Sequence, residues 1–175
     1  MKKLSLISLL VFFASGTVAF TCHSSEIKTN FGKIRYDSQD TLREFNHELY
    51  MGRLKSRIND SDTLEGEVKH KLEYIVQKVM LVLDMQIAKL NFSIVVHPSD
   101  KGVQKSFKQL YNMDVGYIAF YSPGENTVFY SAEDSNLRVV AHEIGHVVAE
   151  HYFQVSPPAK IHEVMAQYAE KHVTD

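Results

Sequence analysis

Two stretches in the first half of the chain carry apolar residues at the spacing of an amphipathic helix. The first predicts a helix over residues 37–58. Its apolar stripe consists of Leu42, Phe45, Leu49 and Leu54. The second predicts a longer helix over residues 64–83, beginning at a candidate capping pair of Asp62 and Glu65. Its apolar stripe consists of Leu64, Val68, Leu72, Ile75, Val79, Val82 and Leu83.

Shorter runs rich in β-branched and aromatic residues follow and predict strands. Residues 91–98 have the composition of a buried strand that ends at a proline. Residues 116–121 and 126–130 are two further runs separated by a Pro-Gly turn, which predicts a β-hairpin. Between the first strand and the hairpin, residues 101–111 predict a short helix. A small antiparallel or mixed sheet is therefore expected.

Helical periodicity returns in the last third of the chain. One helix is predicted over residues 135–152 and another over residues 156–173, with Ser156 as its cap and Pro157 in its first turn. The order of elements is helices, a small sheet and two closing helices. This order predicts a single α+β domain over residues 20–175.

The N-terminal segment has a different pattern. Lys2 and Lys3 precede an apolar run, and Thr17 and Ala19 are small residues at the positions that precede a cleavage site. This layout predicts a signal peptide over residues 1–19 and a protein exported to the periplasm or secreted. The apolar run is shorter than the roughly 20 residues that span a membrane, so no stable insertion is expected after cleavage. The alternative is an N-terminal anchor that stays attached.

Composition and charge narrow the classes of partner. The chain is 45% hydrophobic and 23% charged, as in ordinary globular proteins. Without residues 1–19 it has 17 basic and 21 acidic residues, a net charge of −4, and it contains no basic block. This balance argues against nucleic acid as a partner. Cys22 is the only cysteine, so an internal disulfide is impossible.

The helix predicted over residues 135–152 contains a His-Glu-x-x-His sequence formed by His142, Glu143 and His146. Positions four apart in a helix are offset by only about 40°, so both histidines project from one face. Their imidazole nitrogens can reach one zinc ion, since Zn–N bonds are about 2.0–2.1 Å long. Glu143 lies at the edge of that face. Its carboxylate is suited to take a proton from the water that attacks a carbonyl group.

An amphipathic helix whose polar stripe happens to carry histidines is the alternative interpretation, because nine histidines raise the frequency of chance matches. Two features argue against it. Val139, Val140, Val147 and Val148 surround the stripe, so the helix is apolar on most of its circumference and its histidines need partners. Gly145 costs about 1 kcal/mol relative to alanine inside a helix, which indicates a close approach by another element at that point.

A third ligand is expected on the last helix, because catalytic zinc usually has three protein ligands. The candidates are His162, Glu163 and Glu170. If the last helix folds back on the preceding one, Glu163 lies level with His146, whereas Glu170 lies further along and His162 is turned about 100° away. Small Ala166 would allow the two helices to approach closely. Glu163 is therefore the predicted ligand, and the alternative is a solvated glutamate on a surface helix.

These two segments resemble the gluzincin group of zinc metallopeptidases, which includes thermolysin-like enzymes. The resemblance lies in "AHEIGHVV" followed by "HEVMAQYAE" and covers roughly residues 116–173. It implies a zincin-like fold in which His142, His146 and Glu163 bind Zn²⁺ and Glu143 is the general base. Val164 stands where glycine is common in the family and Gln167 where an acid is common, so the subfamily stays open.

The resemblance also implies roles for residues around the motif. An edge strand before the active-site helix would pair with an extended substrate, and the residues expected to line the cleft are Ile118, Ala119 and Phe120. A tyrosine or histidine would stabilise the oxyanion. Tyr168 is the first candidate for this catalytic role, and the others are Tyr152, His151 and His162.

The expected function is an exported zinc metallopeptidase that hydrolyses peptide bonds in a peptide or protein substrate. A non-catalytic zincin-like binding module with a structural zinc is the main alternative. A metal-buffering protein is a third possibility, and neither alternative requires Glu143.

Overall fold

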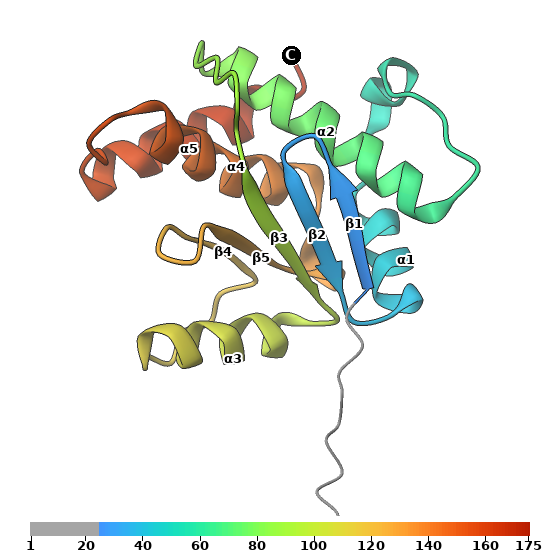
Figure 1. Cartoon of the computed structure of the whole chain (residues 1–175), viewed down its shortest axis with the longest axis horizontal. Coiled ribbons are helices and arrows are strands. Elements are labelled where there is room, and N and C mark those ends of the chain that lie inside the picture. Colours follow the sequence, from blue (N-terminus) through green and yellow to red (C-terminus); the bar gives the residue numbers. More distant parts are fainter. Residues whose placement is uncertain (1–24) are drawn as a thin grey trace, which may run out of the picture.

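A five-stranded mixed sheet lies at the centre of the computed structural model, which describes residues 25–175 (Figure 1). Its strands are β1 (Ser25–Thr29), β2 (Gly32–Tyr36), β3 (Phe92–His97), β4 (Ala119–Ser122) and β5 (Thr127–Ser131). They lie in the order β1-β2-β3-β5-β4. Strands β2, β3 and β5 are parallel, and β1 and β4 are antiparallel to their neighbours. The predicted signal peptide and Cys22 lie outside the described residues.

Five α-helices surround this sheet. They are α1 (Gln39–Glu48), α2 (Leu64–Val82), α3 (Asp100–Tyr111), α4 (Leu137–Tyr152) and α5 (Ala159–His172). Two short 3₁₀ helices, η1 (Gly52–Arg57) and η2 (Ala132–Asp134), complete the described part. These elements confirm the predicted α+β class and the mixed sheet. Within residues 25–175, no helix has the combination of length and apolar character needed to cross a membrane.

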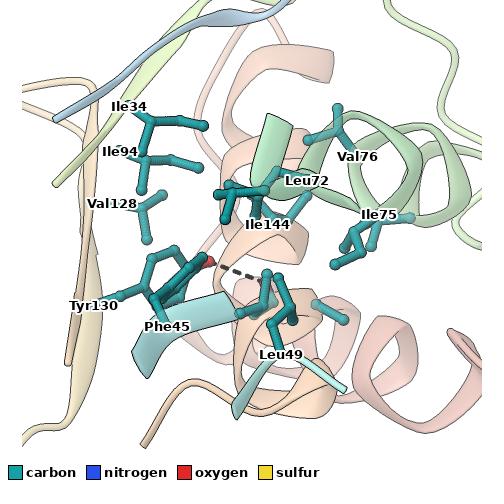
Figure 2. Close-up of a cluster of buried hydrophobic side chains, with 14 of the residues drawn as sticks. Ile34, Phe45, Leu49, Leu72, Ile75, Val76, Ile94, Val128, Tyr130 and Ile144 are labelled. Atoms are coloured by element: carbon teal, nitrogen blue, oxygen red, sulfur yellow. Dashed lines mark hydrogen bonds between the residues drawn. The ribbon is translucent and has the colours of Figure 1, made fainter. Parts of the chain in front are cut away.

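The main core lies between one face of the sheet and helices α1, α2 and α4 (Figure 2). Successive side chains of a strand point to opposite faces, and this face carries fully buried side chains from β2, β3 and β5. These are Ile34, Ile94, Val128 and Tyr130. Phe45, Leu72 and Ile144 meet them from the three helices. The Tyr130 hydroxyl donates to the carbonyl of Val140 at 3.0 Å, which satisfies the one polar atom that this ring brings into the core.

Helix α3 covers the opposite face of the sheet near β3, β4 and β5 (Figure 1). On this face the rings of His97 and Phe129 are stacked, and His97 Nε2 lies 2.9 Å from Ser106 Oγ on α3. The β4–β5 hairpin therefore has α3 on one side and the pair α4 and α5 on the other.

Three predicted boundaries were wrong. The helix predicted over 37–58 ends at Glu48, because Leu49 takes a non-helical ψ of 62°. The chain then turns into η1 at Gly52, which has the left-handed φ of +52°. The cap of α2 is Thr63, whose side chain accepts a hydrogen bond from the Gly66 N–H at 3.1 Å, and not the predicted pair of Asp62 and Glu65. Helix α5 begins at Ala159 rather than at 156, since consecutive prolines hold the chain extended before it.

Strands β1 and β2 were not predicted, although their register is regular. Ile27 pairs with Ile34, and both point into the core. Lysine, arginine and glutamate occupy the alternate positions, where Lys33 and Arg35 form ion pairs with Glu26. Only one or two apolar residues per strand face the core, so the periodic signal is weak.

Helices α4 and α5 pack unusually closely at Gly145. A Cβ atom at this position would lie 2.8 Å from the Cα of Ala166 and 3.3 Å from the Cβ of Ala169. Both alanines are fully buried. The close approach predicted from Gly145 and Ala166 is confirmed, and it places α5 within side-chain reach of the α4 histidines.

Substituting alanine at Gly145 should lower the free energy of unfolding by up to about 2 kcal/mol. The added Cβ would meet the backbone of Ala166, so one of the two helices must move, and such overpacking costs about 1–3 kcal/mol. The better helix propensity of alanine offsets about 1 kcal/mol of this cost. Urea denaturation followed by circular dichroism measures the change. Gly124→Ala is the control, because its Cβ would meet nothing within 4 Å. A stabilised Gly145→Ala protein would contradict the close packing.

Candidate metal and catalytic centre

The structure brings the three predicted metal ligands together. His142 Nε2 lies 3.8 Å and His146 Nε2 lies 3.7 Å from the same oxygen, Oε2 of Glu163. One ligand atom from each residue lies within 4.8 Å of the others. The two histidines project from one face of α4, one turn apart, and Glu163 reaches them from α5. The sequence predicted this arrangement, because Glu163 was expected to lie level with His146 on the returning helix.

Local hydrogen bonds fix the start of α4 and the turn between α4 and α5. Asn136 caps α4 by accepting from the backbone N–H groups of Arg138 and Val139. Helix α4 ends at Tyr152, and the turn before α5 is tied back by Ser156, whose hydroxyl donates to Glu150 at 2.7 Å. The turn reverses the chain, so α5 returns alongside α4.

Two further side chains of α5 orient the candidate ligands. Glu170 Oε2 lies 3.1 Å from His142 Nδ1, the nitrogen that does not face Glu163. Gln167 donates to Oε1 of Glu163 at 2.8 Å and leaves Oε2 facing the histidines. The sequence offers Glu170 only as a candidate ligand that lies too far along the helix. A role in holding His142 was therefore missed.

Glu143 is buried beside the three ligands, with only 9% of its surface exposed. Burial raises the pKa of its carboxyl to about 8; a hydrogen bond from the Tyr121 backbone lowers this pKa, and the charge of Glu163 raises it. Without a nearby cation, the carboxyl is therefore mostly protonated at pH 7. A positive charge held by the histidines would favour the carboxylate, which is the form that accepts a proton.

His146 is held in its neutral form. Burial lowers its pKa to about 4, the neighbouring His142 also lowers it, and Glu163 acts in the opposite direction. A neutral imidazole is the form that binds a metal ion, so protons do not compete for this nitrogen near pH 7.

A cavity of about 610 Å³ opens in front of these residues. Edge strand β4 forms part of its wall, so the predicted edge strand is confirmed as the outermost strand of the sheet. Ala119 and Phe120 line the cavity as predicted, whereas Ile118 precedes the strand and is absent from the lining residues. Tyr117 and Tyr121, which the sequence analysis did not select, line it instead.

The hydrogen-bond pattern of the hairpin shows which backbone groups of β4 face the open edge. Ser131 donates to the carbonyl of Ile118 at 2.9 Å, and Phe120 lies opposite Phe129. Inward and outward residues alternate in an antiparallel pair, so the N–H and C=O groups of Ala119 and Tyr121 point away from β5. The Tyr121 N–H is already used in its hydrogen bond to Glu143. Both backbone groups of Ala119 and the carbonyl of Tyr121 are thus the β4 groups able to pair with an added strand.

The four candidates for the oxyanion role occupy different places. Tyr168 is 49% exposed, packs on His172 with ring centroids 4.3 Å apart, and is absent from the cavity lining. It follows Glu163 by five residues, about 140° around the helix, which turns it away from the ligands. The catalytic role predicted for Tyr168 therefore lacks geometric support. Tyr152 is also exposed and absent from the lining.

His162 is the one of these four that lines the cavity. Its Nε2 lies 3.1 Å from Glu150 Oε2 and 3.2 Å from Ser156 Oγ, and its ring centroid lies 5.9 Å from that of His146. His151, in contrast, uses Nδ1 to contact the carbonyl of its own helix at Val147. His162 is thus the candidate that lies against the cavity, with its Nε2 engaged by Glu150 and Ser156.

Comparisons of the chain with models of protein families, with curated proteins and with solved structures give no match.

Proposed function

We propose that this chain is a zinc-dependent metallopeptidase of the gluzincin type with a zincin-like fold. The observation that carries the proposal is the position of buried Glu143, between the His142–His146–Glu163 cluster and the open edge of β4. The proposed substrate is an extended segment of a peptide or protein. We also propose that the protein is exported, and this part of the proposal is based only on the sequence of residues 1–19.

The three residues fit zinc in ligand type and spacing. Two imidazole nitrogens and one carboxylate oxygen are a common set for catalytic zinc, which leaves a fourth position open. Ligand atoms about 2.0–2.1 Å from one ion at tetrahedral angles lie about 3.3 Å apart. The two His–Glu distances of 3.8 and 3.7 Å are close to that value, so small side-chain rotations suffice. Glu170 on His142 Nδ1 supplies the outer carboxylate that commonly orients a ligating histidine.

The chain's own groups account for the remaining requirements of peptide hydrolysis. Zinc, when bound, supplies a Lewis acid that polarises a carbonyl and lowers the pKa of water. The Glu143 carboxylate accepts the proton of the attacking water and passes it to the leaving amine. The outward N–H and C=O groups of Ala119 hold the substrate extended beside β4. His162 lines the cavity and is the proposed donor to the developing oxyanion, a role for which its Nε2 would have to turn away from Glu150 and Ser156.

Removal and return of zinc test the proposal. The purified protein should hold about one equivalent of zinc by elemental analysis, and chelation should abolish hydrolysis of a mixed peptide library until zinc is restored. A wild type that holds one zinc and cleaves no peptide would instead support the non-catalytic binding module. Less than about half an equivalent after metal-replete purification would overturn both zinc proposals.

A further inference from the structure

We propose that the metallopeptidase selects a large aromatic or aliphatic side chain of the substrate and binds it on an aromatic wall between β4 and α3. This inference rests on the proposed function and names the substrate class of the same cavity. The wall consists of Phe107, Tyr117 and Phe120, all of which line the cavity.

The wall lies on the opposite side of β4 from the metal ligands. Ala119 lies opposite Tyr130 and Tyr121 lies opposite Val128 of β5, and the side chains of both β5 residues enter the core that faces α4. Phe120 alternates with them, and its ring stacks on Phe129 with centroids 4.6 Å apart, on the α3 face. The cavity is lined by residues from both faces, so it wraps around the edge of β4.

The three aromatic rings form a fixed arrangement. The Phe107 ring from α3 meets the edges of Tyr117 and Phe120 at centroid distances of 5.1 and 5.0 Å, with interplanar angles of 84° and 80°. Tyr117 is 49% exposed, so part of this aromatic surface remains available to a ligand. Aromatic rings prefer such edge-to-face contacts, and a further ring or branched aliphatic group can pack in the same way.

Strand geometry assigns one substrate side chain to this wall. A peptide that pairs with the outward backbone groups of Ala119 extends the sheet along β4, and its side chains then alternate between the α4 face and the α3 face. The substrate residue opposite Phe120 therefore points toward Phe107, while its neighbours point toward the metal side. Selectivity should appear at one position and be absent from the positions immediately beside it.

The charges of the cavity reinforce this choice. Among the described residues that line it, Glu143, Glu150 and Glu163 carry carboxyl groups, and none is a lysine or arginine. An acidic side chain on the aromatic wall would lose hydration without gaining a cationic partner. Peptides with aspartate at the selected position should therefore be the poorest substrates.

Scanning peptide libraries test the inference. Phe, Leu, Ala and Asp are placed in turn at each of the three positions on either side of the cleaved bond, and kcat/KM is measured with zinc-loaded protein. At one position Phe or Leu should be preferred over Ala by about tenfold or more, because a filled apolar pocket discriminates by this order. Tyr117→Ala and Phe107→Ala should reduce that preference to about threefold or less.

Leu110→Ala is the matched control, because Leu110 lies on the same helix, is 38% exposed and is absent from the lining. It should retain the wild-type preference. Equal rates for Phe and Ala peptides at all positions, or an equal loss of preference in Leu110→Ala and Tyr117→Ala, would overturn the aromatic wall.

Binding of the same peptides to zinc-loaded Glu143→Gln, measured by calorimetry, separates this inference from the proposed function. If no peptide is cleaved by wild type but the Phe peptide binds about tenfold more tightly than the Ala peptide, the wall stands and the peptidase proposal fails. If neither peptide is preferred in binding or cleavage, the wall is wrong.

Discussion

Replacing Glu143 by glutamine should lower kcat/KM for peptide hydrolysis by about 10²–10⁴-fold, the range expected for loss of a general base, while zinc content stays at the wild-type level. Glutamine keeps the shape of the carboxyl but cannot take the proton of the attacking water. Folding should be unaffected, because the buried carboxyl has its pKa raised to about 8 and is already mostly neutral at pH 7 without zinc. Peptide cleavage, elemental analysis and thermal unfolding measure these three outcomes.

The exposed Glu133, in the 3₁₀ helix η2 before α4, provides the matched control. Glu133→Gln should leave the rate within about twofold of wild type. Hydrolysis retained in Glu143→Gln, or zinc lost with the rate, would contradict the assignment of Glu143 as a base.

Proton release on zinc binding gives an independent view of the same carboxyl. Its raised pKa means that it carries a proton at pH 7 in the metal-free protein and should lose it when a divalent cation binds nearby. Wild type should therefore release up to about one more proton than Glu143→Gln. Calorimetry in buffers of different ionisation enthalpy measures this difference.

Removing a carboxylate that binds zinc directly should weaken zinc binding more than removing one that contacts a ligating histidine. Glu163→Ala removes a ligand and should weaken zinc binding by more than about 100-fold. Glu170→Ala removes only the carboxylate that holds His142 Nδ1 and should weaken binding by about 10–100-fold, as for other outer-shell partners. Competition with a chromophoric chelator measures both affinities. Glu170 is not the predicted ligand, but it is expected to affect zinc binding through its contact with His142.

His47→Ala is a stringent control for those affinities. Glu44, His47 and Glu48 on α1 also bring ligand atoms within 4.8 Å of one another, but His47 is exposed. Its replacement should leave the affinity of the tight site unchanged. A larger loss in Glu170→Ala than in Glu163→Ala would exchange the roles assigned to these two residues.

The parts of the site that sequence could predict are those governed by helical geometry. The fixed rotation and rise per residue put His142 and His146 on one face and Glu163 at their level. Gly145 and Ala166 indicated close packing because small side chains are what such packing needs. The α+β class followed from the change in apolar period along the chain.

Features that depend on contacts between distant segments could not be predicted. The aromatic wall needs Phe107 of α3 to meet Tyr117 and Phe120, and nothing in the local pattern of either segment specifies that contact. The alternation of outward backbone groups on β4 depends on its register with β5. The sequence therefore could not show that Ala119 faces the open edge while the Ile118 carbonyl bonds to Ser131. Strands β1 and β2 owe their place to parallel pairing of β2 with β3, a non-local contact.

The division of the candidate ligands between α4 and α5 has a consequence for stability. A zinc ion on His142, His146 and Glu163 would act as a cross-link that closes the turn between the two helices. Since the ion binds only the folded arrangement, it would add RT ln(1 + [Zn]/Kd) to the free energy of unfolding, about 2.7 kcal/mol at 100 times Kd. The folded fraction of the chain would then rise and fall with the free zinc of its surroundings.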